Sequence, residues 1–484
     1  MSKLEEWVFE AKKNGLTDQE IGEKFNVNLR FIEKTITKRL GVNISSPTVK
    51  KKIKTLQPKN FSPEITTVWS FKSRGNWATH NGNYRGNWSP YIPRNVILRF
   101  SKENELVLDC FCGAGTTGVE SKLTNRNFIG IDINPKAIEL AKENIDFPIY
   151  GTLSGKYTPP EISFDVRDAR DLSFINDETI DLICTHPPYA DIIHYTDNHE
   201  QDLSFYNLND FLEEMSKVAK ENYRVLKNDR YCAVLIGDMR KKKHVIPLGF
   251  WLIDVYLKNG FTLKELVIKR QHNCKTTGFW YKNSIKYNFL LLAHEYLAIF
   301  KKESATFKRQ LLGEIRKSEN LSFKPVKIEK MESTTVWIFN SKDWYIRTIQ
   351  NLIERYDGED YYIINGIDDF DVLDNMHKSE SLVIVSCINQ KNFEKICSNT
   401  NKIVKQIHDK GYLAVICNDV RLNEGTIYPR GIELESYFKN RKELKIKEIV
   451  VISIENNDSK KDVEDNLSIS HKYLLIYCVE KGGK

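Results

Sequence analysis

The sequence has no long apolar run. Its best candidate, residues 289–292, is interrupted by His294 and Glu295, and a membrane-spanning helix needs about 18 apolar residues. The N-terminal segment MSKLEEWVFEAKKNG also has no basic stretch followed by an apolar one, as a secretory signal would. We therefore expect a cytoplasmic protein that does not span a membrane.

Paired cysteines are absent as well. The nine cysteines are scattered singly through apolar segments, as reduced core thiols of a cytosolic protein would be. Cys110 and Cys112 form a lone C-x-C without the second pair that a zinc site requires. The sequence therefore predicts neither disulfides nor a metal site, and places these two residues under a tight loop.

The composition is that of a globular protein with more than one domain. The 484 residues are 41% hydrophobic and 28% charged, and at about 150 residues per domain this length predicts about three units. Lys and Arg exceed Asp and Glu by 7, and residues 1–60 hold 13 basic against 7 acidic residues. This uneven charge favours an N-terminal module that faces a polyanion, although residues 50–54 are equally consistent with a solvated linker.

The basic module has the pattern of a helix-turn-helix in residues 16–41. Thr17 and Glu20 form a capping box, and the first helix ends at residues 26–28. A second, basic helix is expected over residues 29–40, where it would enter a DNA major groove. The alternative is a small helical bundle for protein contacts.

Beyond residue 65, strand-like and helix-like segments alternate. This order predicts an α/β fold, a doubly wound and mostly parallel sheet covered by helices on both faces. Strands near residues 263–269 and 289–300 would form its antiparallel edge. We assign a helix-turn-helix to residues 1–45, a linker to 46–64, a catalytic domain to 65–303, a second linker to 304–330 and a further domain to 331–484.

The last domain repeats the catalytic domain in a diverged form. TTVWSFKS returns as TTVWIFNS, YCAVLIGDMR as YLAVICNDVR, and HEYLAIF as HKYLLIY, in the same order. Three ordered matches indicate duplication of a whole domain. Because no second DCFCGAGTT occurs, the degenerate copy is expected to keep the sheet and lose the chemistry.

The first copy carries a glycine-rich turn after a strand, in VLDCFCGAGTTGVE. Gly113, Gly115 and Gly118 satisfy G-x-G-x-x-G, with Asp132 at the end of the next strand, which alone would also fit a nicotinamide dehydrogenase. Asp109 separates the two interpretations, since a carboxylate there suits a cationic amine better than a pyrophosphate. S-adenosylmethionine has that amine, so Asp132 would accept from its ribose and Asp168 from its adenine.

The strand over residues 181–184 leads into THPPYADIIHY. Together with the glycine loop, this segment resembles the amino-methyltransferases of DNA, which combine a D-x-F-x-G-x-G-like loop with [DNS]-P-P-[YFW]; the resemblance covers about residues 65–300. It implies a Rossmann-like class I methyltransferase fold with S-adenosylmethionine as cofactor. The implied catalytic residues are His186, Pro187, Pro188 and Tyr189, and the implied cofactor-binding residues are Asp109, Phe111, Gly113, Gly115, Thr116, Asp132, Asp168, Asn87 and Ser89.

The resemblance also gives each catalytic residue a role. The His186 side chain and the Pro187 carbonyl would accept from the target NH₂, the two prolines would stiffen the backbone, and Tyr189 would stack on a flipped base. His186 departs from the family, where Asp, Asn or Ser stands first. A neutral imidazole serves in only one tautomer, so we expect activity to fall below the usual imidazole pKa and a flat profile from pH 5.5 to 8 to exclude it.

We therefore predict a DNA methyltransferase acting on adenine N6 or cytosine N4 of duplex DNA, with a cognate restriction endonuclease as a possible partner. The segment over residues 270–287, an exposed basic and aromatic loop, and Lys241–Lys243 are candidates for DNA contact or ordinary solvated loops. The alternatives are an RNA base amino-methyltransferase and a DNA-binding regulator that only senses the cofactor. The base, the recognition sequence and the oligomeric state stay open.

Overall fold

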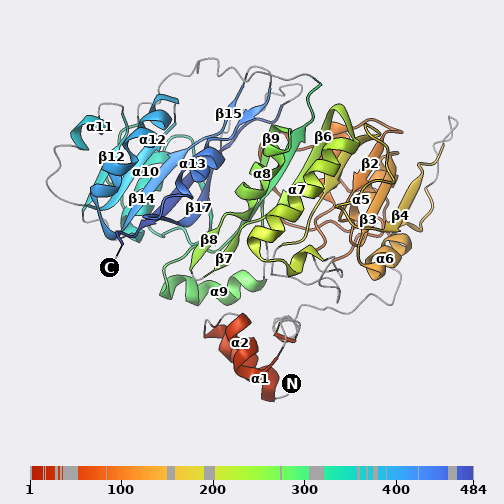
Figure 1. The fold of residues 1–484 in the computed structure, drawn as a ribbon, viewed down its shortest axis with the longest axis horizontal. Helices are drawn as coiled ribbons and strands as arrows, with labels where there is room; N and C mark the ends of the chain where they lie inside the picture. Colours follow the sequence, from red (N-terminus) through yellow and green to blue (C-terminus); the bar gives the residue numbers. More distant parts are fainter. Residues whose placement is uncertain are drawn as a thin grey trace.

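The computed structural model places two twisted sheets side by side, each covered by helices (Figure 1). Among the residues it describes, no helix is both long enough and apolar enough to cross a bilayer. The described residues are 3–14, 16, 18–27, 31–32, 35, 53–82, 84, 86–149, 158–189, 202–241, 243–272, 275–304, 321–356, 360–366, 369–373, 380–388, 390–422, 425–455 and 466–482.

The first sheet has eight strands in the order β1-β9-β10-β6-β5-β2-β3-β4. Only β10 runs antiparallel to its neighbours, so the sheet is mostly parallel, as predicted. The strands are β1 (Val68–Ser70), β2 (Leu106–Asp109), β3 (Asn127–Asp132), β4 (Ile162–Val166), β5 (Ile180–Thr185), β6 (Leu226–Ile236), β9 (Thr262–Arg270) and β10 (His294–Lys301).

Helices cover both faces of this sheet because its strands are apolar on both sides. Val107 of β2 packs in the cluster that contains α4 and α6, whereas its neighbour Leu108 packs in the cluster that contains α7 and α8. The helices are α4 (Tyr91–Phe100), α5 (Thr116–Leu123), α6 (Pro135–Ile145), the 3₁₀ turn η1 (Leu203–Phe205), α7 (Leu208–Val225) and α8 (Leu248–Lys258). The result is the doubly wound, three-layer arrangement that the sequence predicts.

The second sheet has six strands in the order β11-β17-β18-β14-β13-β12. They are β11 (Val336–Asn340), β12 (Tyr361–Ile364), β13 (Glu380–Cys387), β14 (Ile407–Cys417), β17 (Leu444–Glu455) and β18 (His471–Val479). Only β18 is antiparallel to its neighbours, in the place that β10 takes in the first sheet. The helices of this unit are α10 (Trp344–Arg355), α11 (Asp369–Val372), α12 (Gln390–Lys405) and α13 (Arg430–Phe438).

The two sheets therefore follow one plan, and the described part of the second sheet has two strands fewer. Six strands correspond in order and direction, and the positions of β3 and β4 have no strand in the described part of the second unit. Each unit also has a short hairpin after the corresponding central strand, β7 (Met239–Lys241) with β8 (His244–Ile246) and β15 (Val420–Arg421) with β16 (Ile427–Tyr428). Because β3 and β4 lead to Asp132 and Asp168, the described residues of the second unit include no strands that would present such acids.

The structure corrects the predicted edge of the first sheet. β10 begins at His294 and lies between β6 and β9, and the edge strand is β1, which is parallel to β9. The segment 270–287, expected to be a loop joining successive strands, contains helix α9 (Lys275–Lys286). The sequence prediction placed β9 and β10 at the edge because they follow one another in the chain. It did not foresee that β1 pairs with β9, since the paired residues lie about 200 positions apart.

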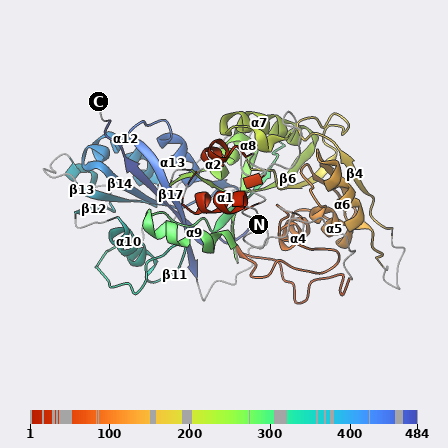
Figure 2. The ribbon, with the colours of Figure 1, turned by 90° about the horizontal axis from the view of Figure 1, so that it is seen from below.

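Helix α9 lies at the carboxyl edge of the first sheet, below both units in Figure 1 and towards the viewer in Figure 2. The N-terminal helices α1 (Lys3–Lys13) and α2 (Asp18–Phe25) lie on the same side. Val8, Ile21 and Ile32 form a small apolar core of their own. Thr17 and most of the expected second helix, residues 29–40, lie outside the described residues, so the helix-turn-helix stays a prediction.

A buried carboxylate ties the glycine-loop helix to the segment that precedes α4. Glu120 of α5 is fully buried and accepts hydrogen bonds from Trp77 Nε1 at 2.7 Å and from Arg94 Nη1 at 2.8 Å, and it lies 2.7 Å from His80 Nε2. Residues 71–90 form no helix or strand in the described part, so their order depends on such contacts. Glu120 thereby fixes the segment that borders the site described below.

We predict that Glu120→Ala lowers the free energy of unfolding by about 3 to 5 kcal/mol, because it leaves the Arg94 guanidinium buried without its anion. Urea unfolding followed by tryptophan fluorescence measures the change. Glu139→Ala, at an exposed position of α6, is the matched control and should leave the midpoint unchanged. Equal midpoints for the two variants would contradict the role given to Glu120.

Candidate active site

The carboxyl ends of β5, β2 and β3 are adjacent in the sheet, and a pocket opens there. Its empty space is about 740 Å³ with open solvent included, within the range of small-molecule sites. The motifs that the sequence singled out thus meet at one edge, as parallel strands require. The lining residues are Tyr84, Gly86, Asn87, Trp88, Asp109, Cys110, Phe111, Cys112, Gly113, Asp132, Ile133, Asp168, Ala169, His186, Pro187, Pro188, Asp202 and Leu203.

Asp109 lies at the end of β2 and is only 2% exposed. Its carboxylate accepts from Thr117 Oγ1 at 2.5 Å, from Thr185 Oγ1 at 2.7 Å and from the Phe111 amide at 3.1 Å. Burial nevertheless outweighs these donors and raises the pKa of Asp109 to about 6. A carboxylate in this state gains from a cationic partner, and it lines the pocket.

The glycine turn follows Asp109 directly. Gly113 and Gly115 have φ of +49° and +77°, which disfavours side chains, and a Cβ at Gly113 would lie 3.1 Å from the Tyr84 ring. A Cβ at Gly115 would lie 3.0 Å from Cβ of Ala141. The turn therefore needs glycine both for its conformation and for space, and Gly113 forms part of the pocket wall.

Asp132 at the end of β3 closes the same turn from the other side. Its carboxylate accepts from the amides of Gly113 and Asn134, both at 2.9 Å. Burial raises the pKa of Asp132 to about 6, and the nearby Asp202 raises it further. Asp132 therefore has a structural task as well as a position in the pocket wall.

Asp168 also lines the pocket, but its carboxylate already has a partner. Arg170 donates to it through Nε at 3.0 Å and through Nη2 at 2.6 Å, and the Arg170 amide donates to Oδ1 at 2.9 Å. The guanidinium also pairs with Glu214 at 2.5 Å. Asp168 is thus held in a fixed position at the rim of the pocket, and each of its two oxygens already accepts from Arg170.

The segment ahead of α4 forms the third wall. Asn87 lines the pocket and accepts a hydrogen bond from Thr116 at the start of α5. Ser89, expected to touch the cofactor, is buried outside the pocket lining, and its hydroxyl donates to the Arg74 carbonyl at 2.7 Å. Neither Thr116 nor Gly115 is part of the lining, so these residues shape the wall from behind.

His186 projects into the pocket between two aromatic rings. Its ring is stacked on Trp88 at 5.6 Å between centroids and meets Tyr189 edge-on at 5.9 Å. A hydrogen bond to the Gly86 backbone raises its pKa, which identifies the imidazole as the donor. Among the described residues Nε2 is buried without a hydrogen-bond partner, so Nδ1 is the donor and Nε2 keeps its lone pair.

Burial lowers the pKa of His186 to about 4, more strongly than Glu295 raises it. The ring is therefore neutral throughout the range from pH 5.5 to 8. Burial between Trp88 and Tyr189 therefore shifts the pH at which we expect activity to fall to below this range. A flat profile over that interval is what a functioning His186 would give.

Tyr189 follows the two prolines, and Glu295 of β10 holds its hydroxyl. Its hydroxyl donates to Glu295 Oε1 at 3.1 Å, and Lys269 Nζ pairs with Glu295 Oε2 at 2.6 Å. Burial raises the pKa of Glu295, but Lys269 and the Tyr189 hydroxyl outweigh it, and the pKa falls to about 2. A Cβ at Gly237 would lie 2.9 Å from the Tyr189 hydroxyl, so the ring has little freedom on that side.

The structure brings together most of the predicted site residues. Asp109, Phe111, Gly113, Asp132, Asp168, Asn87, His186, Pro187 and Pro188 line one pocket. Sequence reasoning missed Tyr84, Asp202, Leu203 and the pair Glu295–Lys269. The repeat offers one signal for Glu295, since the corresponding position in HKYLLIY is Lys472. In the described part, no group of three or more potential ligands could hold a metal ion.

Two family models match this part of the chain. One, described as a DNA methylase, matches residues 3–143, and another, described as a methyltransferase domain, matches residues 101–265. Both include the glycine turn, and the second extends over the pocket.

The curated relatives share short stretches with the chain. Type II methyltransferase M.BglI of Bacillus subtilis is 36% identical over 81 residues, 16% of this chain and 23% of that protein. Type II methyltransferase M2.LlaDCHI of Lactococcus lactis subsp. cremoris is 36% identical over 90 residues, 18% and 32% of the two chains. A tRNA (guanine(10)-N2)-dimethyltransferase of Methanothermobacter thermautotrophicus is 35% identical over 110 residues, 22% and 29%. The chain thus matches about a quarter to a third of the length of these relatives.

The fold and pocket define a class I methyltransferase domain whose cofactor is S-adenosylmethionine. The residues fit that cofactor, because a buried carboxylate with a raised pKa faces a glycine turn that side chains would obstruct. Within this class, residues 3–143 match the DNA methylase model, and the relatives that share short stretches with the chain include type II methyltransferases.

We predict that the affinity for S-adenosylmethionine falls as the pH drops from 7 to 5. The amine and the ribose hydroxyls of the cofactor favour the ionised forms of Asp109 and Asp132. Each of these acids has a pKa of about 6, so below that pH it must lose a proton before the cofactor binds. For each of these acids, the dissociation constant for S-adenosylmethionine should rise by at most about tenfold between pH 6 and pH 5. Isothermal titration calorimetry measures this change, and Asp109→Asn should bind weakly and titrate less steeply. An affinity constant from pH 5 to 7 would contradict the assignment.

Proposed function

We propose that the protein is an S-adenosylmethionine-dependent DNA methyltransferase that methylates an exocyclic amino group, N6 of adenine or N4 of cytosine, of a base flipped out of the duplex. The observation that carries this proposal is the unpaired, buried His186 Nε2 beside the Pro187 backbone, in the same pocket as Asp109 and the glycine turn. Two acceptors next to a site for a cationic donor match the needs of an amino group under attack.

We assign the cofactor to the wall that β2, β3 and the segment ahead of α4 build. Asp109 and the backbone of the glycine turn would hold the amino-acid end, with Asn87 beside them, and Asp132 would accept from the ribose hydroxyls. Asp168 would accept from the adenine amino group while sharing its carboxylate oxygens with Arg170. Phe111 contributes an apolar surface, and Gly115, Thr116 and Ser89 support the wall from outside the lining.

The chemistry follows from the acceptor pair. An exocyclic amino nitrogen is a weak nucleophile, because its lone pair is delocalised into the base ring. Acceptors aimed at both N–H groups favour a tetrahedral nitrogen, and a neutral imidazole is one of them. When bound, S-adenosylmethionine would supply a methyl group from its sulfonium sulfur. The S–C bond would break as the amino nitrogen bonded the methyl group, and that nitrogen would release one proton to water.

The cysteines support direct transfer over a covalent route. Burial raises the pKa of Cys110, Cys112 and Cys184 well above the ordinary thiol value, so none of these three supplies a thiolate near neutral pH. Methylation of cytosine C5 needs such a nucleophile. The pocket therefore favours an amino group as the acceptor.

DNA is the proposed polymer because the family is that of the DNA methylases and the N-terminal residues are strongly basic. Tyr189 offers a ring on which an extruded base would stack. This ring meets the His186 ring edge-on, whereas Trp88 stacks on it. A cognate restriction endonuclease is a further proposal from the type II relatives. Transfer of labelled methyl groups to duplex DNA, with structured RNA in parallel, tests the polymer.

Long-read sequencing of DNA from a host that expresses the gene would identify the base and the recognition sequence together.

Pro188→Ala and Tyr189→Ala separate an enzyme from a regulator that only senses the cofactor. Both variants should bind S-adenosylmethionine as the wild type does and lose transfer. Preferential methylation of RNA, or no transfer by the wild type to any nucleic acid, would overturn the proposal.

We predict that His186→Leu lowers kcat about 100-fold or more, as loss of one positioned hydrogen-bonding group does in other active sites. His186→Asn restores an acceptor oxygen of the family type and should keep most of the activity. Methyl-transfer assays under saturating cofactor measure both. The wild-type profile should stay flat from pH 5.5 to 8 and fall only towards pH 4, as the imidazole protonates. Equal activity of the Leu and Asn variants would remove His186 from the mechanism.

A further inference from the structure

The two units contact each other through pairs of matching residues. Thr335 of the second unit lies 2.9 Å from His294 Nδ1 in the first, and Thr67 of the first unit lies 2.8 Å from His471 Nδ1 in the second. In the repeat, Thr335 corresponds to Thr67 and His471 to His294. Each threonine hydroxyl also accepts from a backbone amide of the other unit, Ala293 at 3.0 Å and Ser470 at 3.1 Å.

Two ion pairs repeat the same reciprocity. Arg240 pairs with Glu448 across the interface at 2.5 Å, and Arg421 pairs with Glu265 at 2.6 Å. Both glutamates are fully buried, and each also accepts a backbone amide of the other unit at 3.1 Å. Burial raises the pKa of both glutamates while the arginines lower it. Such buried pairs fix a register, because removing either partner leaves an uncompensated charge.

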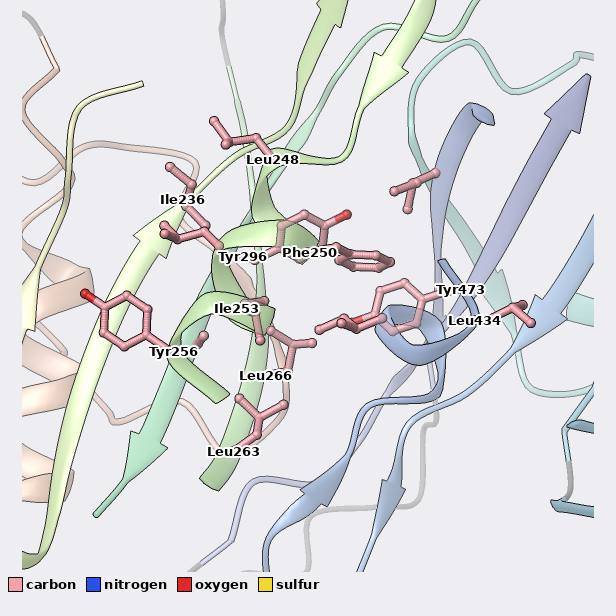
Figure 3. Packing of buried hydrophobic residues seen from close by; sticks show 14 of the residues in the cluster. Ile236, Leu248, Phe250, Ile253, Tyr256, Leu263, Leu266, Tyr296, Leu434 and Tyr473 are labelled. Carbon is pink, nitrogen blue, oxygen red and sulfur yellow. The ribbon is translucent and has the colours of Figure 1, made fainter. Parts of the chain in front are cut away.

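Apolar packing joins the units between these polar pairs. Helices α8 and α13 contact each other, and Phe250 of α8 meets Tyr473 of β18 edge-on at 5.6 Å (Figure 3). One buried cluster runs through both units without interruption. Each hairpin packs on the other unit's strand, β8 on β17 and β16 on β9. The units are thus related as two subunits of a symmetric dimer would be.

Several residues of this interface recur in both copies. Thr67, His294, Tyr296, Arg240 and Glu265 recur unchanged as Thr335, His471, Tyr473, Arg421 and Glu448. The residues beneath the Tyr189 ring do not recur. Glu295 corresponds to Lys472, and Lys269 corresponds to Ile452. The second copy has therefore kept its contacts with the first and lost the catalytic support.

The interface leads directly to the catalytic residues of the first unit. Leu291 pairs by backbone hydrogen bonds with Ser333 at 3.0 Å and Thr335 at 2.9 Å, which fixes the chain just before β10. His294 follows, held by Thr335, and the next residue, Glu295, accepts from the Tyr189 hydroxyl. Tyr189 is thus two side-chain contacts away from the second unit.

We propose that the C-terminal unit serves as a built-in partner subunit of the catalytic unit, and that Thr335 is a positioning residue, which sets Tyr189 through His294 and Glu295. The proposal rests on the proposed function for the role of Tyr189. The mirror contact, Thr67 with His471, has the same chemistry and burial but leads to Lys472, whose ammonium lies over the Trp344 ring. The molecule therefore contains its own matched control.

The test compares Thr335→Val with Thr67→Val in the full chain. Each variant removes one buried hydroxyl from one His contact, so the two should lower Tm by similar amounts. Thr335→Val should lower kcat about tenfold or more, since small misplacements of reacting groups are costly, whereas Thr67→Val should change it less than about twofold. Thr335→Ser restores the hydroxyl and should restore kcat, and the dissociation constant for S-adenosylmethionine should stay unchanged in all three variants.

Hydrogen exchange supplies a readout that does not need activity. Peptides covering residues 182–189 should exchange faster in Thr335→Val than in the wild type and at the wild-type rate in Thr67→Val. Equal effects of the two valine variants on kcat and on this exchange would overturn the inference. If the wild type transfers no methyl group, the proposed function fails, while the exchange comparison still decides whether Thr335 positions the segment that contains Tyr189.

Discussion

The Asp109 carboxylate is the point on which the site depends. It is buried at the end of β2, yet it accepts from α5 through Thr117 and from the end of β5 through Thr185. One charged group therefore joins the cofactor wall to the strand that delivers His186. The cost of burying it is visible in its raised pKa, and a cationic ligand would offset that cost. Ligand binding and local order are coupled through the same atoms.

Much of the catalytic unit could be predicted from the sequence, because its parallel strands end in recognisable motifs. Asp109, Asp132 and His186 converge since neighbouring parallel strands point their carboxyl ends to one edge. The place of β1 could not be predicted, because it depends on pairing with a strand about 200 residues away. Glu295 and the lowered pKa of His186 were likewise beyond reach, since both arise from burial between distant segments.

The repeat could be recognised from three short sequence segments, but the role of the second copy could not. Sequence similarity alone marked TTVW and its counterparts as relics of duplication. The structure gives them a present task, because those residues meet across the two units in reciprocal pairs. The matching segments thus include residues that join the two units.

The exchanged hairpins limit how the molecule can move. β8 packs against β17, and β16 packs against β9, so a hairpin of each unit contacts a strand of the other. Domains joined by a small polar boundary usually pivot, whereas interlocked arms and a continuous apolar interior resist hinge opening. The two sheets should therefore behave as one rigid body.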